Sequence, residues 1–340
     1  MNTNSHRRRV IIILTENECS QCGYEQVVIH RKYNGQRLCS NCFKKSVESK
    51  VLKTIKKQKL VNKHDKVLVG LSGGKDSVAL LKILNILKEK RVIDLEAVTI
   101  DEGIAGYRAE GVRIAKDVAK SLGIKHHIVS FEDEYDFTID DIMRVESESE
   151  HPQHACTFCG VFRRQVFNKM AREVNADKIA TGHNLDDETQ SIMMNYIEGN
   201  INNMVRIGYK TEARDERFTP KIKPLREIPE KEIGLYVLES GYEVHFDGCP
   251  YAHESFRMEV GDFIRETTLK HPTIMYSILQ GFEKIKPVLK ENYMENHEGK
   301  PNKTCNKCGE PSSKDICKSC KFLDDIHEKL ANRWLWWKLN

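Results

Sequence analysis

Residues 67–77 read Val-Leu-Val-Gly-Leu-Ser-Gly-Gly-Lys-Asp-Ser. The first three residues are apolar and mostly β-branched, a glycine-rich turn follows, and apolar residues then recur with helical spacing as far as Leu87. This order predicts a strand, a tight loop and a helix. Gly73 and Gly74 lack a Cβ atom, so their backbone can approach an anion closely, and the helix amino terminus adds partial positive charge. The stretch therefore predicts a phosphate-binding loop to which Lys75 adds a full charge.

Strand and helix patterns alternate after this loop. Further strands are predicted at 95–100, 127–129 and 178–182, and amphipathic helices at 112–122 and around 192–196. Such alternation predicts an α/β fold with a doubly wound parallel sheet, in which ligands bind beyond the carboxyl ends of the strands. The glycine- and aspartate-rich motifs follow strands, so we expect them at that edge. A helical segment is predicted at 255–288.

The composition describes a soluble globular protein of two or three domains. The net charge of the 340 residues is only +4, so the whole molecule is not a strong polyelectrolyte. No apolar run approaches the roughly 20 residues of a membrane helix. Residues 7–14 combine three arginines with a short apolar run, but Glu16 and Glu18 follow at once, so we interpret them as a basic arm and not a secretion signal. A cytoplasmic protein is expected.

Eight of the eleven cysteines lie in four Cys-x-x-Cys pairs near the two ends of the chain. Without a secretion signal, this spacing indicates metal sites and not disulfides. The first two pairs flank a predicted hairpin with Asn34-Gly35 at its turn, which would bring four thiolates together around Zn²⁺. The ligands predicted for the first zinc are Cys19, Cys22, Cys39 and Cys42, and those for the second are Cys305, Cys308, Cys317 and Cys320. Four thiolates complete the coordination shell, so both sites are predicted to be structural.

The remaining three cysteines lie in the middle of the chain. Cys156 and Cys159 open a predicted helix at 160–174, and Cys249 ends a strand-like segment at 245–249. A helix amino terminus lowers a thiol pKa. Three interpretations stay open: a [4Fe–4S] cluster with one iron left free, a redox pair that carries a persulfide, and buried thiols or a three-thiolate zinc site. The distant third cysteine favours the cluster.

Together, these motifs resemble the TtuA/NcsA group of tRNA 2-thiouridine synthetases, in the TtcA-like family of the N-type ATP pyrophosphatases. The resemblance covers nearly the whole chain. It rests on the two four-cysteine ribbons, on Ser72–Ser77, on Cys-Thr-Phe-Cys-Gly-Val-Phe-Arg-Arg at 156–164, on Thr-Gly-His-Asn-Leu-Asp-Asp-Glu at 181–188, and on Cys-Pro-Tyr at 249–251. The Ser-Gly-Gly-Lys-Asp-Ser spacing differs from the Gly-x4-Gly-Lys-Ser/Thr loop of kinases and motor proteins.

The resemblance implies an enzyme, a tRNA-uridine 2-sulfurtransferase that splits ATP into AMP and pyrophosphate. ATP would adenylate the C2 oxygen of a tRNA uridine, and sulfide on the open iron of the cluster would then replace that oxygen. The implied cofactors are a [4Fe–4S] cluster on Cys156, Cys159 and Cys249, two Zn²⁺, and ATP with Mg²⁺. The implied partners are a tRNA, a second copy of the chain, and a sulfur donor, either a ubiquitin-like thiocarboxylate carrier or free sulfide. Relatives act on position 34 or 54, and a composition rich in Asn and Cys favours position 34.

The resemblance also implies individual site residues. The ATP contacts would be Gly70, Leu71, Ser72, Gly73, Gly74, Lys75, Asp76, Ser77, Ile100, Arg163, Gly182 and Asp187. The catalytic residues would be Lys75, Asp76, Arg163 and Asp187. Some members have lysine where Arg163 stands, but an arginine pKa above about 12 prevents proton donation, so Arg163 is predicted to clamp phosphates. Asp76 and Asp187 would position Mg²⁺ or orient the base, with Asp186 and Glu188 as second choices; helix amino-terminal charge is the alternative explanation for each acid.

We divide the chain into six parts. These are an amino-terminal zinc ribbon with a basic arm (1–48), a basic helical linker (49–64), a PP-loop catalytic domain (65–254), a helical segment (255–300), a carboxyl-terminal zinc ribbon (301–323) and an aromatic tail (324–340). The three tryptophans of the tail would pack on the body or stack on RNA bases. Two rival functions stay open, a persulfide-based thiolation without a cluster and a non-catalytic zinc-ribbon scaffold that binds RNA.

Overall fold

A parallel sheet of five strands, in the order β5-β4-β3-β6-β7, forms the centre of the molecule. The structure is a computed structural model that describes residues 17–211, 215–252, 256–296 and 303–339, so the predicted arm at 7–14 lies outside it. The chain adds β4 and β5 on one side of β3 and then returns to add β6 and β7 on the other. This order confirms the doubly wound α/β class, and it places the switch point, where such sheets bind ligands, between β3 and β6.

The strands of the sheet are β3 (Lys66–Gly70), β4 (Asp94–Asp101), β5 (Lys125–Ser130), β6 (Lys178–Ala180) and β7 (Lys221–Ile222). The helices are α1 (Ser40–Lys57), α2 (Lys75–Glu89), α3 (Arg108–Ser121), α4 (Phe131–Tyr135), α5 (Ile139–Glu146), α6 (Ala155–Glu173), α7 (Leu185–Ile197), α8 (Ile201–Met204), α9 (Glu230–Glu239), α10 (Phe256–Lys270), α11 (Ile274–Asn296) and α12 (Lys318–Leu339). None of these described helices combines the length and the apolar character that a membrane crossing needs.

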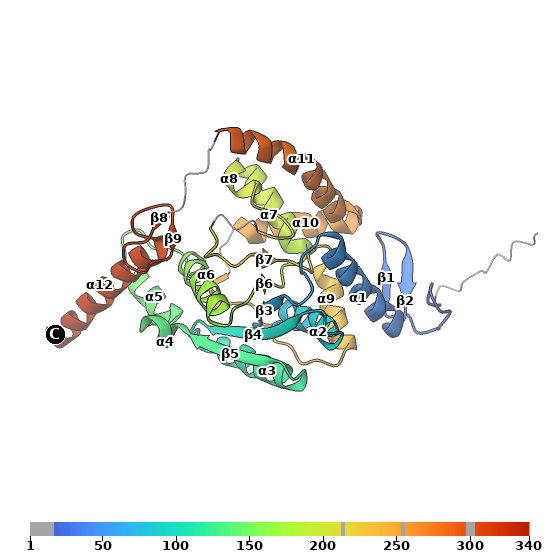
Figure 1. Cartoon of the computed structure of the whole chain (residues 1–340), viewed down its shortest axis with the longest axis horizontal. Helices are drawn as coiled ribbons and strands as arrows, with labels where there is room; N and C mark the ends of the chain where they lie inside the picture. Colours follow the sequence, from blue (N-terminus) through green and yellow to red (C-terminus); the bar gives the residue numbers. More distant parts are fainter. Residues whose placement is uncertain (1–16, 212–214, 253–255, 297–302, 340) are drawn as a thin grey trace, which may run out of the picture.

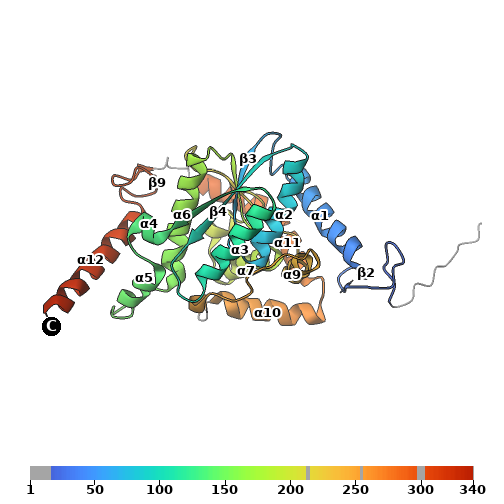
Figure 2. The same ribbon diagram turned by 90° about the horizontal axis from the view of Figure 1, so that it is seen from below.

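Helices cover both faces of the sheet (Figures 1 and 2). Alternate residues of a strand point to opposite faces. Val67 and Val69 of β3 therefore lie in one buried cluster with side chains of α1, α2, α3 and α9, whereas Leu68 lies in a second cluster with α4, α5, α6 and α12. A third cluster joins α7, α10 and α11. We refer to the two faces below as the α2 face and the α6 face.

The two cysteine ribbons lie at opposite ends of the molecule (Figure 1). In the first, β1 (Ile29–Arg31) pairs antiparallel with β2 (Gln36–Leu38), which confirms the hairpin predicted around Asn34-Gly35. In the second, β8 (Lys303–Thr304) pairs antiparallel with β9 (Pro311–Ser312), and α12 follows directly. The side chains of the three tryptophans lie outside the described residues.

Three segments differ from the predictions. Residues 245–249 do not form a strand, because their only sheet-like pairing among the described residues is one bridge between His245 and Gly74. The helical segment at 255–288 is divided into α10 and α11, since Pro272 disfavours a helical conformation at the residue before it. The strand β7 was not predicted, because its two residues, Lys221 and Ile222, are too few to show a period of two.

Candidate functional site

The loop between β3 and α2 is closed by its own serines. Ser77 Oγ donates a hydrogen bond to the Gly74 carbonyl at 2.9 Å and accepts one from the Ser72 amide at 3.1 Å. Gly73 has a φ of 86°, and a Cβ atom there would overlap the Gly111 carbonyl, so the turn requires glycine. Helix α2 begins without a side-chain cap, which leaves its first amides for a bound anion. The geometry is that of the predicted phosphate loop.

Asn184 joins two of the predicted acids. Its Nδ2 donates to Asp76 Oδ1 at 3.0 Å, and it forms a capping box with Asp187 at the start of α7. Burial raises the pKa of Asp76 and that of Asp187, and each carboxylate is affected by neighbouring negative charge. Carboxylate pairs held beside a phosphate loop are the ligands that Mg²⁺ prefers, because it binds oxygen from carboxylates and phosphates. The predicted Asp76 and Asp187 therefore share one site.

Lys75 points toward the α2 face of the sheet. Its Nζ lies 3.1 Å from Asp76 Oδ2 and 2.7 Å from Glu230 Oε1, at the start of α9. Burial opposes its charge, but the two carboxylates outweigh burial and raise the pKa of Lys75. Lys75 is therefore a cation at the loop, as predicted.

The two second-choice acids have other partners. Asp186 Oδ2 accepts a hydrogen bond from the Glu230 amide at 2.8 Å. Glu188 is fully buried and pairs with Lys223 at 2.5 Å and with Arg226 at 2.6 Å. Because a buried carboxylate needs such partners, Glu188 holds the fold together and is not free to bind a ligand.

Gly182 follows β6 at the switch point. A Cβ atom on this residue would lie 3.0 Å from the backbone carbon and 3.1 Å from the Cβ of Asp76. The loop after β3 and the loop after β6 therefore approach each other as closely as their backbones allow. This contact brings the motif at 181–188 next to the phosphate loop.

Arg108 ties the end of β4 to the loop. Its guanidinium donates to the Ile100 carbonyl at 2.9 and 2.6 Å and to the Ser72 carbonyl at 2.9 Å, and it pairs with Glu102 at 2.7 Å. The carbonyl oxygen of Ile100 already accepts these two hydrogen bonds. A nucleotide that contacts Ile100 would therefore meet its other atoms. Glu102 also lies 3.3 Å from Arg163 Nε.

Arg163 lies on α6 between Glu102 and Cys159. Burial opposes its charge, but the neighbouring Glu102 and Cys159 raise its pKa. Its side chain is 44% exposed, so it reaches the open edge of the sheet. Arg163 is therefore a permanent cation beside the central cysteines.

The three central cysteines lie on the α6 face. Cys156 and Cys159 lie in the first two turns of α6, and Cys249 directly precedes a short 3₁₀ helix, η1 (Pro250–Ala252), that packs against α6. Cys159 and Cys249 pack against the same buried cluster. The structure thus brings the three together at the carboxyl edge of the sheet, although their segments are far apart in the sequence.

The central cysteines are more widely spaced than the ligands of one ion. Within the described ranges, only the two four-cysteine groups bring three or more ligand atoms within 4.8 Å of one another. In an iron–sulfur cluster each thiolate binds a different iron atom, so its sulfur atoms must stand farther apart than those around a single ion. The three central cysteines therefore lack the close spacing of a three-thiolate zinc site.

The expectation that the start of α6 lowers a thiol pKa is wrong for Cys159. Burial raises the pKa of Cys159 to about 11, and the positive charge of Arg163 offsets only part of this effect. Burial also raises the pKa of Cys249. Neither thiol is an activated nucleophile in the free protein, because the thiolate is the reactive form.

The segment that carries Cys249 is bonded to the phosphate loop. The His245 amide donates to the Gly73 carbonyl at 2.9 Å, and the His245 ring lies 5.1 Å from the ring of Tyr107. Since only three residues separate His245 from Cys249, the position of the third cysteine depends on the conformation of the loop.

Each ribbon gathers four sulfur atoms at the spacing of a tetrahedral ion. The Sγ–Sγ distances are 3.7 Å for Cys22–Cys39, 3.6 Å for Cys308–Cys317 and 3.8 Å for Cys305–Cys320. Zinc–sulfur bonds of about 2.3 Å in a tetrahedron place sulfur atoms about 3.8 Å apart. Although burial opposes it, hydrogen bonds from backbone amides lower the pKa of Cys19 and that of Cys305 to about 6. The donor set fits Zn²⁺ in both ribbons.

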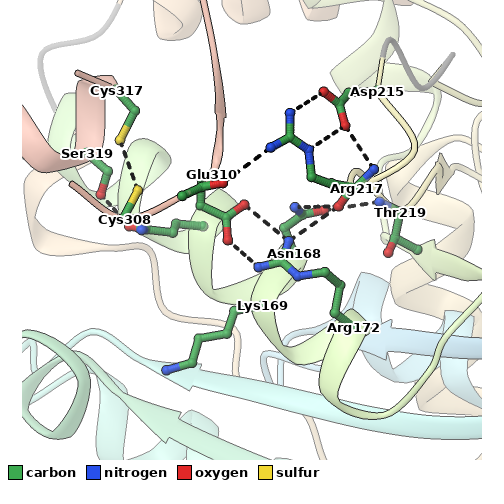
Figure 3. Close-up of polar contacts among 12 residues, drawn as sticks. Asn168, Lys169, Arg172, Asp215, Arg217, Thr219, Cys308, Glu310, Cys317 and Ser319 are labelled. Carbon is green, nitrogen blue, oxygen red and sulfur yellow. Dashed lines mark hydrogen bonds and ion pairs between the residues drawn. The ribbon is translucent and has the colours of Figure 1, made fainter. Parts of the chain in front are cut away.

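The carboxyl-terminal ribbon is fastened to the outer end of α6 (Figure 3). Glu310 pairs with Arg172, and Arg217 pairs with Asp215 at 2.7 Å while also donating to the Gly309 carbonyl. These contacts hold the ribbon against the carboxyl-terminal end of α6 and the segment around Arg217.

Several residues of the site were not predicted individually. Asn184 lies inside the motif at 181–188, so its position was visible but its role was not. Glu102, Arg108, Glu230 and His245 have no local signal, because each reaches the site through tertiary contacts. Only the fold could have identified these four.

The fold and the loop define a PP-loop protein with a four-cysteine group near each end. A family model described as a PP-loop domain matches residues 43–257, and one described as the N-terminal LIM domain of 2-thiouridine synthetase TtuA matches residues 18–44. The chain is 36% identical to the tRNA 2-thiolation protein NcsA of Haloferax volcanii, over 91% of this chain and 99% of that protein. It is 32% identical to the cytoplasmic tRNA 2-thiolation protein 1 of Danio rerio, over 92% of this chain and 89% of the other.

A solved structure shares the fold over most of its length. It is the U34-tRNA thiolase NcsA from Methanococcus maripaludis with its [4Fe–4S] cluster, with a TM-score of 0.75 and 35% identity over 91% of this chain and 96% of that one. The chain therefore belongs to the TtuA/NcsA group of the PP-loop family, as the sequence motifs predicted.

Proposed function

We propose that this protein is a tRNA-uridine 2-sulfurtransferase that uses ATP to activate the C2 oxygen of uridine 34. The observation that carries the proposal is the meeting of a phosphate loop and three widely spaced cysteines at one sheet edge. The relatives support the substrate, because they are named tRNA 2-thiolation proteins and one is named for uridine 34.

The residues of the loop would bind and activate ATP. The free amides at the start of α2, together with Lys75, would hold the phosphates that leave as pyrophosphate, and Asp76 and Asp187 would hold Mg²⁺. The uridine C2 oxygen would attack the α-phosphorus while the bond to the β-phosphate breaks. Arg163 would neutralise the negative charge that develops on the α-phosphate. Sulfur would then form a bond to C2 while the C2–O bond breaks and AMP leaves.

Cys156, Cys159 and Cys249 would hold the [4Fe–4S] cluster, which supplies an iron atom with an open position for sulfur. Both ribbons would hold structural Zn²⁺, because four thiolates leave no open position. We further propose the six-part division of the chain given above, a cytoplasmic homodimer, and a thiocarboxylate carrier or free sulfide as the sulfur source.

One reconstitution tests the proposal. Anaerobically purified protein with its cluster is mixed with ATP, Mg²⁺, sulfide and an unmodified tRNA transcript, and 2-thiouridine is mapped by mass spectrometry. We expect 2-thiouridine at position 34 and one AMP for each sulfur transferred, and no product with Asp76→Ala. Product at position 54 would overturn the assignment of the uridine. Full activity in protein stripped of its iron would exclude the cluster route, and no product in any arm would favour the scaffold.

A further inference from the structure

Two cations on the α6 face have no acidic partner among the residues that the structure describes. Helix α6 and the segment 215–226 together carry eight cations: Arg163, Arg164, Lys169, Arg172, Arg217, Lys221, Lys223 and Arg226. Six of them pair with a carboxylate at 4.0 Å or less. Arg164 and Lys221 have no carboxylate partner within the part of the chain that the structure describes.

Lys221 points from β7 toward the α6 face. Its Nζ lies 6.0 Å from the centroid of the Phe167 ring, whereas the next residue, Ile222, is buried on the opposite face. The same ring covers the end of β3, since a Cβ atom on Gly70 would lie 2.8 Å from it. The ammonium of Lys221 therefore lies near the strand end from which the phosphate loop begins, but on the α6 face.

Arg164 folds back toward the start of α6. Its Nη1 would lie 3.4 Å from a Cβ atom on Gly160, which directly follows Cys159. Burial and the charge of Arg163 lower the pKa of Arg164, while the nearby Cys159 acts in the opposite direction. The residue as a whole is exposed. Its guanidinium therefore lies near Cys159 and can be reached from solvent.

The two side chains lie in a field of like charge. Burial, together with the positive charges of Arg164, Arg163 and Lys223, lowers the pKa of Lys221 to about 8. Cations that repel one another in a partly buried position destabilise the empty site, and an anion bound between them removes that repulsion. The arrangement favours a negatively charged ligand.

We propose that Arg164 and Lys221 bind a backbone phosphate of the RNA next to the uridine that is modified. This inference rests on the proposed function. The phosphates flanking a nucleotide enter the site with its base, and phosphate contacts set the register of a nucleic acid on a protein. The loop has its own cation, Lys75, which reaches Glu230 on the opposite face of the sheet. The exposed Arg164 lies where a large polyanion can reach it.

The test measures RNA and ATP binding separately. The cluster-loaded full chain and its Arg164→Ala, Lys221→Ala and double variants are titrated with an unmodified tRNA transcript at several salt concentrations. Lys169→Ala is the matched control, because Lys169 lies on the same helix and pairs with Glu134 away from the cysteines. ATP affinity is measured for each variant, and wild-type thiolation is assayed in parallel.

We expect each single variant to bind tRNA about fivefold to tenfold more weakly near 0.15 M salt. We also expect the negative slope of log K against log salt to become less steep by about 0.7 to 1. ATP affinity should change less than about twofold, and Lys169→Ala should match wild type. Unchanged tRNA binding in the double variant would overturn the inference. So would weaker ATP binding with intact tRNA binding, which would assign the pair to the triphosphate. A wild type that does not thiolate tRNA would instead disprove the proposed function.

Discussion

The protein has two kinds of cysteine group, and they differ in whether a metal bound by them would keep a free coordination position. In each ribbon four sulfur atoms lie within 4.8 Å of one another, and an ion among them would have no free position. The three central cysteines are wider apart, come from two distant segments, and lie next to a phosphate loop. Under the proposed function, the same side chain would serve closed coordination at the ends and open chemistry at the centre.

Individual cations on the α6 face also differ in whether a carboxylate pairs with them. Around the carboxyl-terminal ribbon, the cations Arg172 and Lys307 pair with Glu310 and Asp324 (Figure 3 shows the first pair). On the α6 face, Arg164 and Lys221 lack such partners among the residues described. Paired charge fastens a domain, whereas unpaired charge is available to a ligand.

The largest expected effect comes from removing one thiol of each kind. Cys249→Ser should reduce thiolation by a factor on the order of 10³ or more and abolish iron binding, with two zinc ions retained, because it removes a ligand of the open site. Cys308→Ser is the matched change in a closed site, and it should lose one zinc and lower the melting temperature while iron and most activity remain. Metal analysis and mass spectrometry of the tRNA measure both. Iron retained by Cys249→Ser would mean that Cys249 is not a ligand of the cluster.

A smaller effect is expected at Asn184, which has both a structural and a positioning role. Asn184→Ala removes the cap of α7 and the hydrogen bond to Asp76, so we expect about 1 kcal/mol less stability and roughly tenfold slower turnover. Asn184→Ser is the matched control, because serine can cap the helix but is too short to reach Asp76. It should regain stability without regaining turnover. Thermal unfolding and pyrophosphate release with saturating tRNA separate the two roles; recovery of both by serine would contradict the positioning role.

The closed sites and the loop were predictable because their residues are close in the sequence. The first two Cys-x-x-Cys pairs and the Asn34-Gly35 turn between them are enough to predict the hairpin that brings the thiols together. The run at 67–77 is likewise enough to predict the strand, the loop and the helix. What depends on burial was not predictable. The helix start at Cys159 suggested a lowered pKa, but burial by residues from other segments raises it. That Lys221 has no acidic partner among the described residues likewise depends on which residues of α6 face the two-residue strand β7.

The smallest expected effect is a pH dependence that distinguishes Lys221 from its permanently charged neighbours. Its pKa is lowered to about 8, below that of a free lysine, so its positive charge is present below pH 8 and is lost as the pH rises. A bound phosphate favours the charged form and raises this pKa, so binding takes up a proton above pH 8. Affinity for tRNA should therefore fall about fivefold between pH 7 and pH 9.

Lys221→Arg keeps the charge but cannot lose it in this range. Fluorescence anisotropy of a labelled tRNA should then show a flatter pH profile for this variant than for wild type, with similar affinity at pH 7. The comparison isolates Lys221, because the other charged groups near it, Arg163, Arg164 and Lys223, are the same residues in both proteins. Identical profiles for the two proteins would mean that the ammonium of Lys221 does not meet the RNA, and that only the paired charges and the loop hold the substrate.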